Sequence, residues 1–535
     1  MASSFSVLTF FLPPSLLLFM FFFSFFLILR VFVARFIWSN GRCFTCHGPE
    51  MHPFIGCLIP FYRNRRRLLD WFTELLAASP TQTIVLERLG ARRTVVTANA
   101  DNVEYMLKTN FDNYPKGKPF TDILGDLLGC GIFNADGELW HTQRKLASHE
   151  FTTRSLREFV VKTLDAETNE RLLPILSSAC KDRRTVDMQD LLRRFAFDTV
   201  CKVALGTDPG FLDPSLPMSD LAAAFEVASG ICARRGAALV SAVWKVKRTL
   251  GVGSEGRLRA SVRLIHESVM GLIRRRKEEA AAGKGAERSD LLSRLISGGH
   301  SDEVIRDMVI SFVMAGRDTT SAALTWFFWL ISRQPEIERE VVREAADRAD
   351  RGQGLDRYQE LKEMKFLEAC LCESMRLYPP VAWDSKHAAR DDVLPDGTEV
   401  RRGDRVTYFP YGMGRMERLW GKDWMEFEPR RWLEAEGREL ARVSAYKFAV
   451  FQAGPRVCLG KEMAFVQMKY IAAAVLRHFE LRRAGGEQRP PVLVPLLTAH
   501  MAGGLKMVVR ERRELDSTGR LRGGGCDRLE TIVNS

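Results

Sequence analysis

The stretch that decides the fold is FQAGPRVCLG, residues 451–460, in which a single cysteine, Cys458, stands between two glycines. Gly454 and Gly460 allow close backbone approach and unusual torsions. The following residues, 461–479, have the pattern of a helix, and a helix N-terminus directly after a cysteine favours the thiolate. The stretch therefore predicts a turn that presents one sulfur to a metal ion. A buried structural cysteine beside a helix start is the alternative.

A second pattern, RCFTCHGPE at 42–50, places Cys43, Cys46 and His47 at the C-x-x-C-H spacing of c-type haem attachment. This pattern lies just past an apolar N-terminal segment and among prolines, which is typical of a stiff hinge and not of a haem pocket. Covalent haem attachment is also normally made on the non-cytosolic side of a membrane. We interpret the spacing as that of linker residues, and no second ligand pair follows that would favour zinc.

The composition excludes several classes of protein. Lys and Arg number 78 and Asp and Glu 66, which gives a formal net charge of +12. The excess is spread along the chain, so we expect no nucleic acid partner, and a basic surface that faces an anionic membrane or an acidic protein is favoured. Eleven cysteines, an odd number at irregular spacing, favour a reducing compartment over a disulfide framework.

The N-terminal segment carries no charged side chain from Met1 to Leu29, which is long enough to cross a bilayer core of about 30 Å. A cleaved signal peptide is the alternative, but it would have a basic start and a shorter apolar segment. Basic residues follow, so the positive-inside rule places the rest of the chain in the cytosol. We expect a single-pass anchor over 1–37, a juxtamembrane hinge over 38–62, one domain over 63–510 and a disordered tail over 511–535.

Apolar spacing predicts the secondary structure. Residues 83–98 have the β-branched content of a hairpin, and most of 139–333 has helical spacing. The longest apolar-periodic segment, 301–334, begins with Ser301 as a natural N-cap. Four charged residues make it a central buried helix and not a second membrane span: Arg306, Asp307, Arg317 and Asp318. The fold class expected is mainly α with small β-sheets (α+β).

Five separated motifs follow one another along the chain. They are Trp140-x-x-x-Arg144, AGRDTT at 315–320, Glu373-x-x-Arg376, FEPRRW at 427–432 with Arg431, and FQAGPRVCLG. Each alone is a weak or moderate match, but all five in this order resemble the cytochromes P450, the haem-thiolate monooxygenases, over roughly residues 50–510. The resemblance implies the P450 fold with an N-terminal membrane anchor and makes 63–510 the catalytic domain.

The resemblance also implies a cofactor, haem b, with Cys458 as the axial thiolate ligand of the iron. Further cofactor contacts are expected from Arg456, Phe451, Gly454, Trp140, Arg144 and His387. The arginine, tryptophan and histidine side chains would donate hydrogen bonds to the haem propionates, and Phe451 would cover the sulfur. Related animal fatty-acid hydroxylases often carry a glutamate that esterifies the haem. The matching residue here is Ala315, so we expect the haem to be held only by Cys458 and by non-covalent contacts.

By the same resemblance, Thr319 and Asp318 deliver protons to bound dioxygen, while Gly316 opens a groove in the helix for dioxygen and water. Without the resemblance, a threonine in mid-helix would simply bond back to a carbonyl one turn earlier. Glu373, Arg376 and Arg431 are implied to form a buried structural lock. By themselves, Glu373 and Arg376 would form an ordinary surface pair.

The substrate is suggested by a narrower resemblance. NFDNYPKGKPFTDILGDLLGCGIFNADGELW and FPYGMGRMERLWGKDW look like plant P450s that oxidise the terminal carbon of fatty acids, and WDSKHAARDDVLPDGT suggests the branch that acts on jasmonoyl-isoleucine. The expected pocket residues are Phe120, Thr121, Ile123, Leu124, Phe312, Ala315, Val381, Ala382, Trp383, His500 and Met501, each with simple core packing as the alternative. Lys116, Lys118 and Arg234 are possible anchors for a substrate carboxylate, although surface solvation is favoured for each.

The expected partners follow from this assignment. Electrons should come from NADPH through a membrane-bound NADPH–cytochrome P450 reductase, which would dock near Lys145 and Lys461. The protein should lie in the endoplasmic reticulum membrane with its catalytic domain in the cytosol. Three alternatives stay open: a haem-thiolate isomerase or lyase of fatty hydroperoxides, a non-catalytic membrane haem sensor or scaffold, and a monooxygenase whose substrate is a free fatty acid.

Overall fold

The structure, a computed structural model, describes residues 22–31, 48–152, 154–213, 219–236, 238, 241–283, 290–351, 357–435, 437, 439–485 and 490–512. Residues 22–31 of the expected anchor form a helix. The rest of the anchor, the Cys43, Cys46 and His47 pattern and the tail beyond Arg512 lie outside the described residues. Within the described part of the chain, no helix has both the length and the apolar character that crossing a membrane requires.

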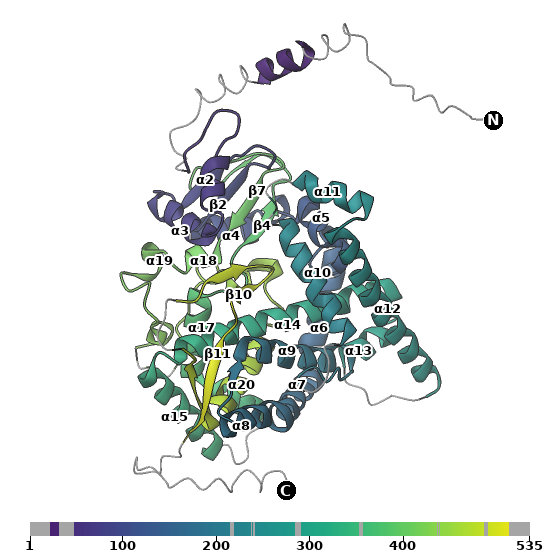
Figure 1. The fold of residues 1–535 in the computed structure, drawn as a ribbon, viewed down its shortest axis with the longest axis vertical. Helices are drawn as coiled ribbons and strands as arrows, with labels where there is room; N and C mark the ends of the chain where they lie inside the picture. The colour runs from purple at the N-terminus through teal and green to yellow at the C-terminus, as the bar shows by residue number, and fades with distance from the viewer. Residues whose placement is uncertain are drawn as a thin grey trace, which may run out of the picture.

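The centre of the molecule is α14 (Asp302–Ile331), the longest helix described. The Ser301 side chain accepts a hydrogen bond from the Val304 N–H (3.5 Å) and caps the helix. Most of the side chains of α14 are buried, because α9 (Met188–Leu205), α17 (Lys365–Leu377) and α20 (Lys461–His478) pack around it. Figure 1 shows α14 crossing the middle of the fold. The prediction of a central buried helix with an N-cap at Ser301 is confirmed.

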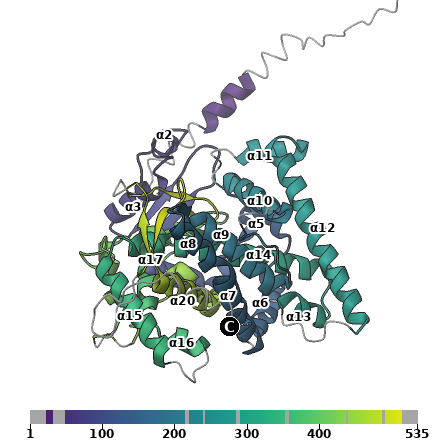
Figure 2. The ribbon, with the colours of Figure 1, turned by 60° about the horizontal axis from the view of Figure 1, so that its bottom comes forward.

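Further helices surround this centre on two sides. One group consists of α5 (Gly117–Leu128), α10 (Asp220–Gly236), α11 (Ser241–Leu250), α12 (Ser254–Ala281) and α13 (Leu291–Ser297). The helix α6 (Gly137–Thr152) packs with this group. The other group consists of α7 (Arg154–Glu167), α8 (Leu173–Lys181), α15 (Pro335–Arg351) and α16 (Arg357–Glu363). Figure 2 shows α20 between α15 and α7, which pack on it from either side.

Small β-sheets complete the fold. The largest has the order β1-β2-β7-β4, from Thr83–Leu86, Thr94–Thr97, Arg405–Tyr408 and Asp384–His387, and only the β2–β7 pair is parallel. The hairpin predicted within 83–98 is therefore confirmed as β1 and β2. The smaller sheets are β3 (Thr185–Asp187), β11 (Lys506–Glu511) and β8 (Phe479–Arg483); β9 (Leu493–Pro495) and β10 (Ala499–Met501); and β5 (Asp392–Val393) and β6 (Glu399–Val400).

The described part of the expected hinge, 48–62, packs on the first sheet. It includes the start of α2 (Leu58–Arg63), and the α3 helix (Leu68–Ala78) follows. Cys57 is fully buried, and its N–H donates to the Glu87 carbonyl (2.8 Å). In Figure 1 these elements lie at the same end of the molecule as α11.

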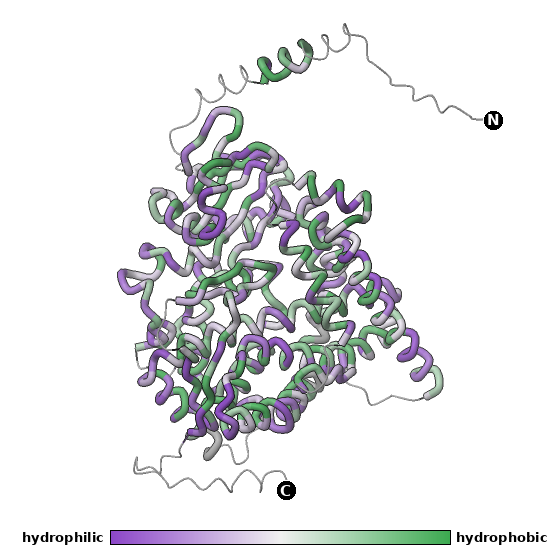
Figure 3. The backbone as a smooth tube through the Cα atoms, in the orientation of Figure 1, coloured by the Kyte–Doolittle hydropathy of each residue, from purple (hydrophilic) through white to green (hydrophobic). Residues whose placement is uncertain are grey.

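The largest core cluster lies between the second half of α14, α17 and α20. Trp326 is fully buried and stacks on Tyr378 with ring centroids 4.0 Å apart, while its indole N–H donates to the Ala499 carbonyl (3.2 Å). This contact ties α14 to β10. By contrast, α11 exposes Val243, Val246 and Leu250. Figure 3 shows hydrophobic stretches of the backbone at the edge of the molecule where α11 lies. The mainly helical fold with small sheets that the sequence predicts is confirmed.

Candidate active site

The loop that carries Cys458 is shaped by its own backbone. The 3₁₀ turn η6 (Gly454–Arg456) precedes the cysteine, and α20 begins three residues after it. The Cys458 N–H donates to the Phe451 carbonyl (2.8 Å), and the Phe451 ring packs against Phe465 with centroids 5.3 Å apart. The predicted turn that leads into a helix is therefore present.

The two glycines of this loop differ in their roles. Gly454 has φ +64°, and a Cβ built there would lie 2.0 Å from the Leu107 carbonyl oxygen. Only glycine fits that position, because the backbones touch and φ is positive. Gly460 has φ −85°, and a Cβ there would only meet Phe151 at 3.8 Å. The expectation of an unusual torsion or close approach at Gly460 is therefore wrong.

The Cys458 thiol is accessible to solvent, yet protein atoms on most sides desolvate it. The Cys458 side chain can therefore be reached by a small molecule, although bulk water does not surround it. Burial raises the pKa of this thiol above its ordinary value, and the Gly460 N–H, Arg144 and Lys461 only partly oppose it. The N–H at the helix start thus favours the thiolate as expected, but it does not outweigh burial. A thiol in this setting ionises when a metal cation binds it.

Four predicted cofactor contacts gather beside this loop. Arg456 donates to the Asp136 carboxylate (2.7 Å) and to the Ala135 carbonyl (2.9 Å), and its guanidinium lies 4.4 Å from the centre of the Trp140 ring. Arg144, one turn along α6 from Trp140, donates to the Val457 carbonyl (2.5 Å). The Nε atom of Arg456 is buried and has no hydrogen-bond partner among the described residues.

His387, the fourth predicted contact, ends strand β4 close to this group. Its Nδ1 lies 2.6 Å from the Lys116 carbonyl oxygen, so Nδ1 carries the proton in the neutral ring. Its Nε2 is buried and makes no hydrogen bond within the described part of the chain. Burial lowers the pKa of His387 to about 4. A carboxylate placed at Nε2 would favour the protonated ring and so reverse this shift.

The structure reveals a buried cationic group that sequence reasoning missed. Lys386 is fully buried on β4, and its ammonium lies 3.1 Å from Asp384, which also pairs with Lys116 (2.7 Å). Burial lowers the pKa of Lys386 to about 7, although Asp384 opposes the shift. Asp384 also accepts from the Tyr408 hydroxyl (3.0 Å). The available signal was Asp-x-Lys in a strand, where residues two apart share a face.

On α14, the Thr319 hydroxyl donates to the Ala315 carbonyl (2.6 Å), one turn earlier. Asp318 and Arg317 are both buried, with Asp318 Oδ1 2.8 Å from Arg317 Nε. The structure gives Gly316 a different role from the predicted groove: a Cβ there would lie 2.7 Å from the Val200 side chain of α9. Gly316 therefore allows α9 and α14 to approach closely.

Comparison with known proteins places this arrangement in a family. The sequence model described as Cytochrome P450 matches residues 46–505. The chain belongs to the cytochrome P450 family. Cytochrome P450 94B1 of Arabidopsis thaliana is 57% identical over 476 residues, which cover 88% of this chain and 92% of that protein. Cytochrome P450 94A1 of Vicia sativa is 44% identical over 474 residues, which cover 87% and 90%.

Similarity also extends to solved structures. The chain matches a structure titled "Crystal structure of cytochrome P450DA heme domain" with a TM-score of 0.73 at 20% sequence identity, over 88% of this chain and 98% of that chain. The fold is therefore that of a P450, and the protein is a cytochrome P450 monooxygenase.

The residues around Cys458 fit the haem that membership of this family implies. The thiol offers an accessible metal ligand. Beside it, Arg456 Nε and His387 Nε2 are buried without partners among the described residues, and the Lys116, Asp384 and Lys386 group carries more positive than negative charge. Buried cationic groups of this kind are satisfied by carboxylates such as the two propionates of haem.

The predicted lock of this P450 is formed by residues from α17 and from the 3₁₀ turn η4 (Pro429–Trp432). Glu373 and Arg376 are buried and joined by two hydrogen bonds of 2.8 Å, and Arg431 Nε donates to Glu373 (2.9 Å). Glu373 also accepts from the Glu428 N–H (2.9 Å) and the Trp432 indole (2.8 Å). We call Glu373, Arg376 and Arg431 the lock.

The predicted pocket residues come from several elements around α14. Leu124 is buried in the cluster that Phe120, Ile123 and Phe312 also join, whereas Ala382 and Trp383 belong to the cluster under the first sheet. Met501 is buried in the largest core cluster. The others are part-buried: Thr121, Ala315, Val381 and His500. The structure thus places several of them in core packing.

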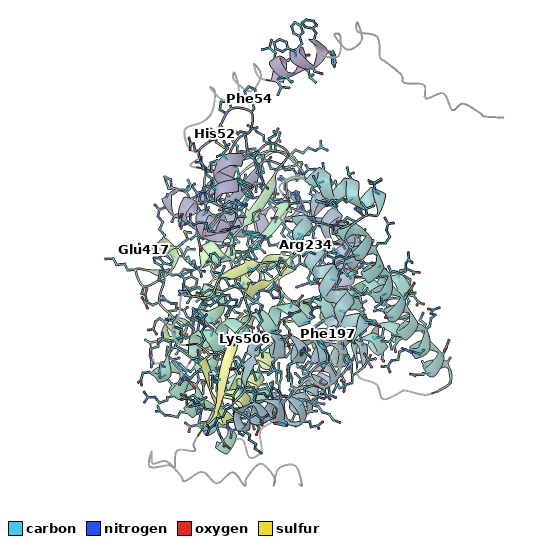
Figure 4. All side chains as sticks on the ribbon, in the orientation of Figure 1. His52, Phe54, Phe197, Arg234, Glu417 and Lys506 are labelled. Carbon is cyan, nitrogen blue, oxygen red and sulfur yellow. The ribbon has the colours of Figure 1, made fainter. Side chains whose placement is uncertain are left out.

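The three predicted anchors differ. Lys116 is buried and paired with Asp384, so the expectation of a solvated surface lysine is wrong there. Lys118 is exposed and lies 3.3 Å from Asp122, and Arg234 is exposed on α10, where Figure 4 labels it. Lys145 and Lys461 are exposed, near Arg144 and the Cys458 loop.

Proposed function

We propose that this P450 hydroxylates the terminal (omega) carbon of fatty acids or of jasmonoyl-amino acid conjugates, with dioxygen and electrons derived from NADPH. The observation that carries the proposal is the buried acid Asp318 directly before Thr319 in the centre of α14. Hydroperoxide isomerases and lyases need no such pair, because they take no external protons or electrons. Likeness to plant P450s of the 94B and 94A groups supports the substrate class.

Bound haem with a thiolate ligand supplies dioxygen activation and favours O–O cleavage. The chain's part is to hold that group and to control protons. Cys458 would provide the sulfur ligand, while Arg456, Arg144, Trp140, His387 and Lys386 would hold the propionates. These donors are fixed by protein contacts before the group arrives, which keeps the cost of ordering them low.

Thr319 is suited to pass protons because of its bond to Ala315. While the hydroxyl donates to that carbonyl, Thr319 Oγ1 keeps lone pairs that can accept a proton. Once the hydroxyl turns from the Ala315 carbonyl toward the reacting oxygen, it can give its proton there and accept another from the side of Asp318. Asp318 draws its proton from solvent, and the buried position of Asp318 beside the half-buried Thr319 limits the access of bulk water.

Terminal oxidation needs an apolar channel that admits only the chain end and a distant polar anchor for the carboxylate. Phe120, Leu124 and Phe312, which join one apolar cluster near α14, are the residues we propose for the channel wall. Arg234 is the proposed anchor, because it is exposed on α10 and so is free of the buried pairing that occupies Lys116.

We also propose a location and an electron donor. Residues 1–37 would anchor the protein in the endoplasmic reticulum membrane with the catalytic domain in the cytosol. The exposed valines and leucine of α11 lie at the end of the molecule that also carries α2 and could rest on that membrane. NADPH–cytochrome P450 reductase would dock beside Lys145 and Lys461 on the side of the Cys458 loop.

The test is turnover of the purified protein with reductase, NADPH and a panel of free fatty acids and jasmonoyl conjugates. We expect terminal alcohols to form only with NADPH and dioxygen. Thr319→Ala should raise peroxide release per NADPH, because the side chain that passes protons to the reacting oxygen is lost. NADPH-independent turnover of a fatty hydroperoxide would favour the isomerase or lyase, and an absence of NADPH consumption with every lipid would favour a haem sensor.

A further inference from the structure

Four charged or titratable side chains gather around Asp318 and form a group of five with it. Arg193 comes from α9, Glu226 from α10, Arg317 and Asp318 from α14, and His500 from β10. Elements far apart in sequence therefore supply one group. We call these five residues the relay cluster. Phe197, one turn along α9 from Arg193, lies 6.0 Å from the Arg317 guanidinium, and Figure 4 labels it beside this part of the fold.

Two close pairs make up most of the relay cluster. Arg193 lies 3.0 Å from Glu226, and Arg317 Nε lies 2.8 Å from Asp318 Oδ1. The second pair is poorly aligned, so Asp318 Oδ1 and Arg317 Nη1 are both buried without a hydrogen bond among the described residues. The Nε of Arg193 is in the same situation. Buried polar atoms left this way are suited to water molecules that exchange protons.

Each pair influences the other through its charges. Burial would raise the pKa of Glu226, but the charges of Arg193, Arg317 and His500 outweigh it and lower that pKa. Burial lowers the pKa of His500, with Asp318 and Glu226 opposing the shift and Arg193 and Arg317 assisting it. At neutral pH, Glu226 is therefore a charged carboxylate and His500 an uncharged imidazole, and both interact with Arg193 and Arg317.

Exposure falls steadily across the relay cluster. The exposed fraction of the side chain is 46% for Glu226 and 21% for Arg193, then 7% for Arg317 and 5% for Asp318. Glu226 therefore touches solvent, whereas Asp318 lies within the core beside Thr319. The cluster therefore reaches from solvent at Glu226 to the buried acid that the proposed function uses.

We propose that Glu226 and His500 form the solvent end of a proton path to Asp318. A proton from bulk water is taken up at Glu226 and passes, through His500 or through water, to the Asp318 carboxylate, which then hands it on to Thr319. Every group that gives up a proton regains one from the solvent side, so the cluster returns to its starting state. Arg193 and Arg317 are positioning residues that hold the two carboxylates apart. This inference rests on the proposed function.

The test uses the full-length protein with haem and reductase, turning over a fatty acid of the panel above. Glu226→Gln should raise peroxide per NADPH and enlarge the solvent deuterium isotope effect on product formation. The loss of product should stay below the about 10²- to 10⁴-fold contribution of a positioned acid–base group, because His500 still exchanges protons. Glu226→Asp keeps the acid and should restore coupling. Glu417→Gln, an exposed glutamate that projects from the far edge in Figure 4, is the matched control.

The outcomes separate the two proposals. If Thr319→Ala does not uncouple the enzyme, the proposed function fails and the proton path with it. If Thr319→Ala uncouples while Glu226→Gln leaves the peroxide yield and isotope effect unchanged, only the path through Glu226 is overturned. If Glu226→Gln fails to take up haem, His500→Gln decides: raised peroxide with a larger isotope effect supports the path, and normal coupling overturns it.

Discussion

The lock on α17 and the relay cluster on α14 are both ion networks inside the fold, yet they differ in how completely their atoms are paired. Glu373 of the lock accepts hydrogen bonds from Arg376, Arg431, Trp432 and the Glu428 N–H. Asp318 of the relay cluster leaves a buried oxygen without one, although Arg317 lies beside it. A fully paired network fixes a shape, whereas a partly paired one can exchange protons with its surroundings.

The largest expected effect concerns the Cys458 sulfur, the proposed ligand of the haem iron. Cys458→Ala should abolish thiolate ligation of haem, because no other thiol of the described chain stands in that loop. Cys43→Ser should leave haem content unchanged. The measurement is the spectrum of the reduced, carbon-monoxide-treated protein. Equal haem loss in both variants would show that the C-x-x-C-H pattern holds the cofactor.

Removing one member of the lock should give the next largest effect. Glu373→Gln leaves Arg376 and Arg431 buried near a neutral partner, which should cost roughly 3–5 kcal/mol in the free energy of unfolding. The control is Arg430→Gln, whose side chain is exposed and pairs with Glu340 (2.8 Å), and which should change stability by less than about 1 kcal/mol. Thermal unfolding measures both, and similar losses would remove the distinction between lock and surface pairs.

His387 should make stability depend on pH in acid. Its pKa in the fold is about 4, below the ordinary value of about 6.5, so between these values the unfolded chain binds more protons. Stability of the haem-free protein should therefore fall by about 3 kcal/mol as pH drops through that window. His387→Gln should flatten the slope.

With haem bound, a propionate at Nε2 should favour the protonated ring, and the slope of the native protein should be smaller. Chemical unfolding at a series of pH values gives the two curves. Identical curves with and without haem would argue against the propionate contact and leave His387 as a core residue.

The smallest effect concerns single thiols. Cys130 is exposed and should react with iodoacetamide in the folded protein. Burial raises the pKa of Cys232 to about 12 and raises the pKa of three other buried thiols, Cys201, Cys370 and Cys372, so these four should stay unlabelled until the chain unfolds. Mass spectrometry of the labelled peptides reads the result, and labelling of Cys370 before unfolding would mean that α17 opens more readily than its packing implies.

Local patterns predicted the features that depend on local physics. The cap at Ser301, the hairpin at β1 and β2 and the helical spacing of α14 follow from neighbouring residues, and motif order led to the lock. The burial of Lys116 and Lys386 was not predicted, because it depends on segments about 270 residues apart in sequence that meet only in the fold. A close approach was expected at Gly460 but is found at Gly316 for the same reason: only the packed structure tells which glycine faces a neighbour.

The contact at Gly454 has a consequence for how the protein is assembled. The Leu107 carbonyl that Gly454 touches lies in the π-helix η1 (Tyr105–Thr109), hundreds of residues earlier in the chain. Because long-range contacts form late, the cysteine loop cannot settle until this early segment has its final shape. Cofactor uptake should therefore be a late step of folding and not an early one. Slow synthesis of the last hundred residues should delay cofactor uptake without disturbing the N-terminal sheet.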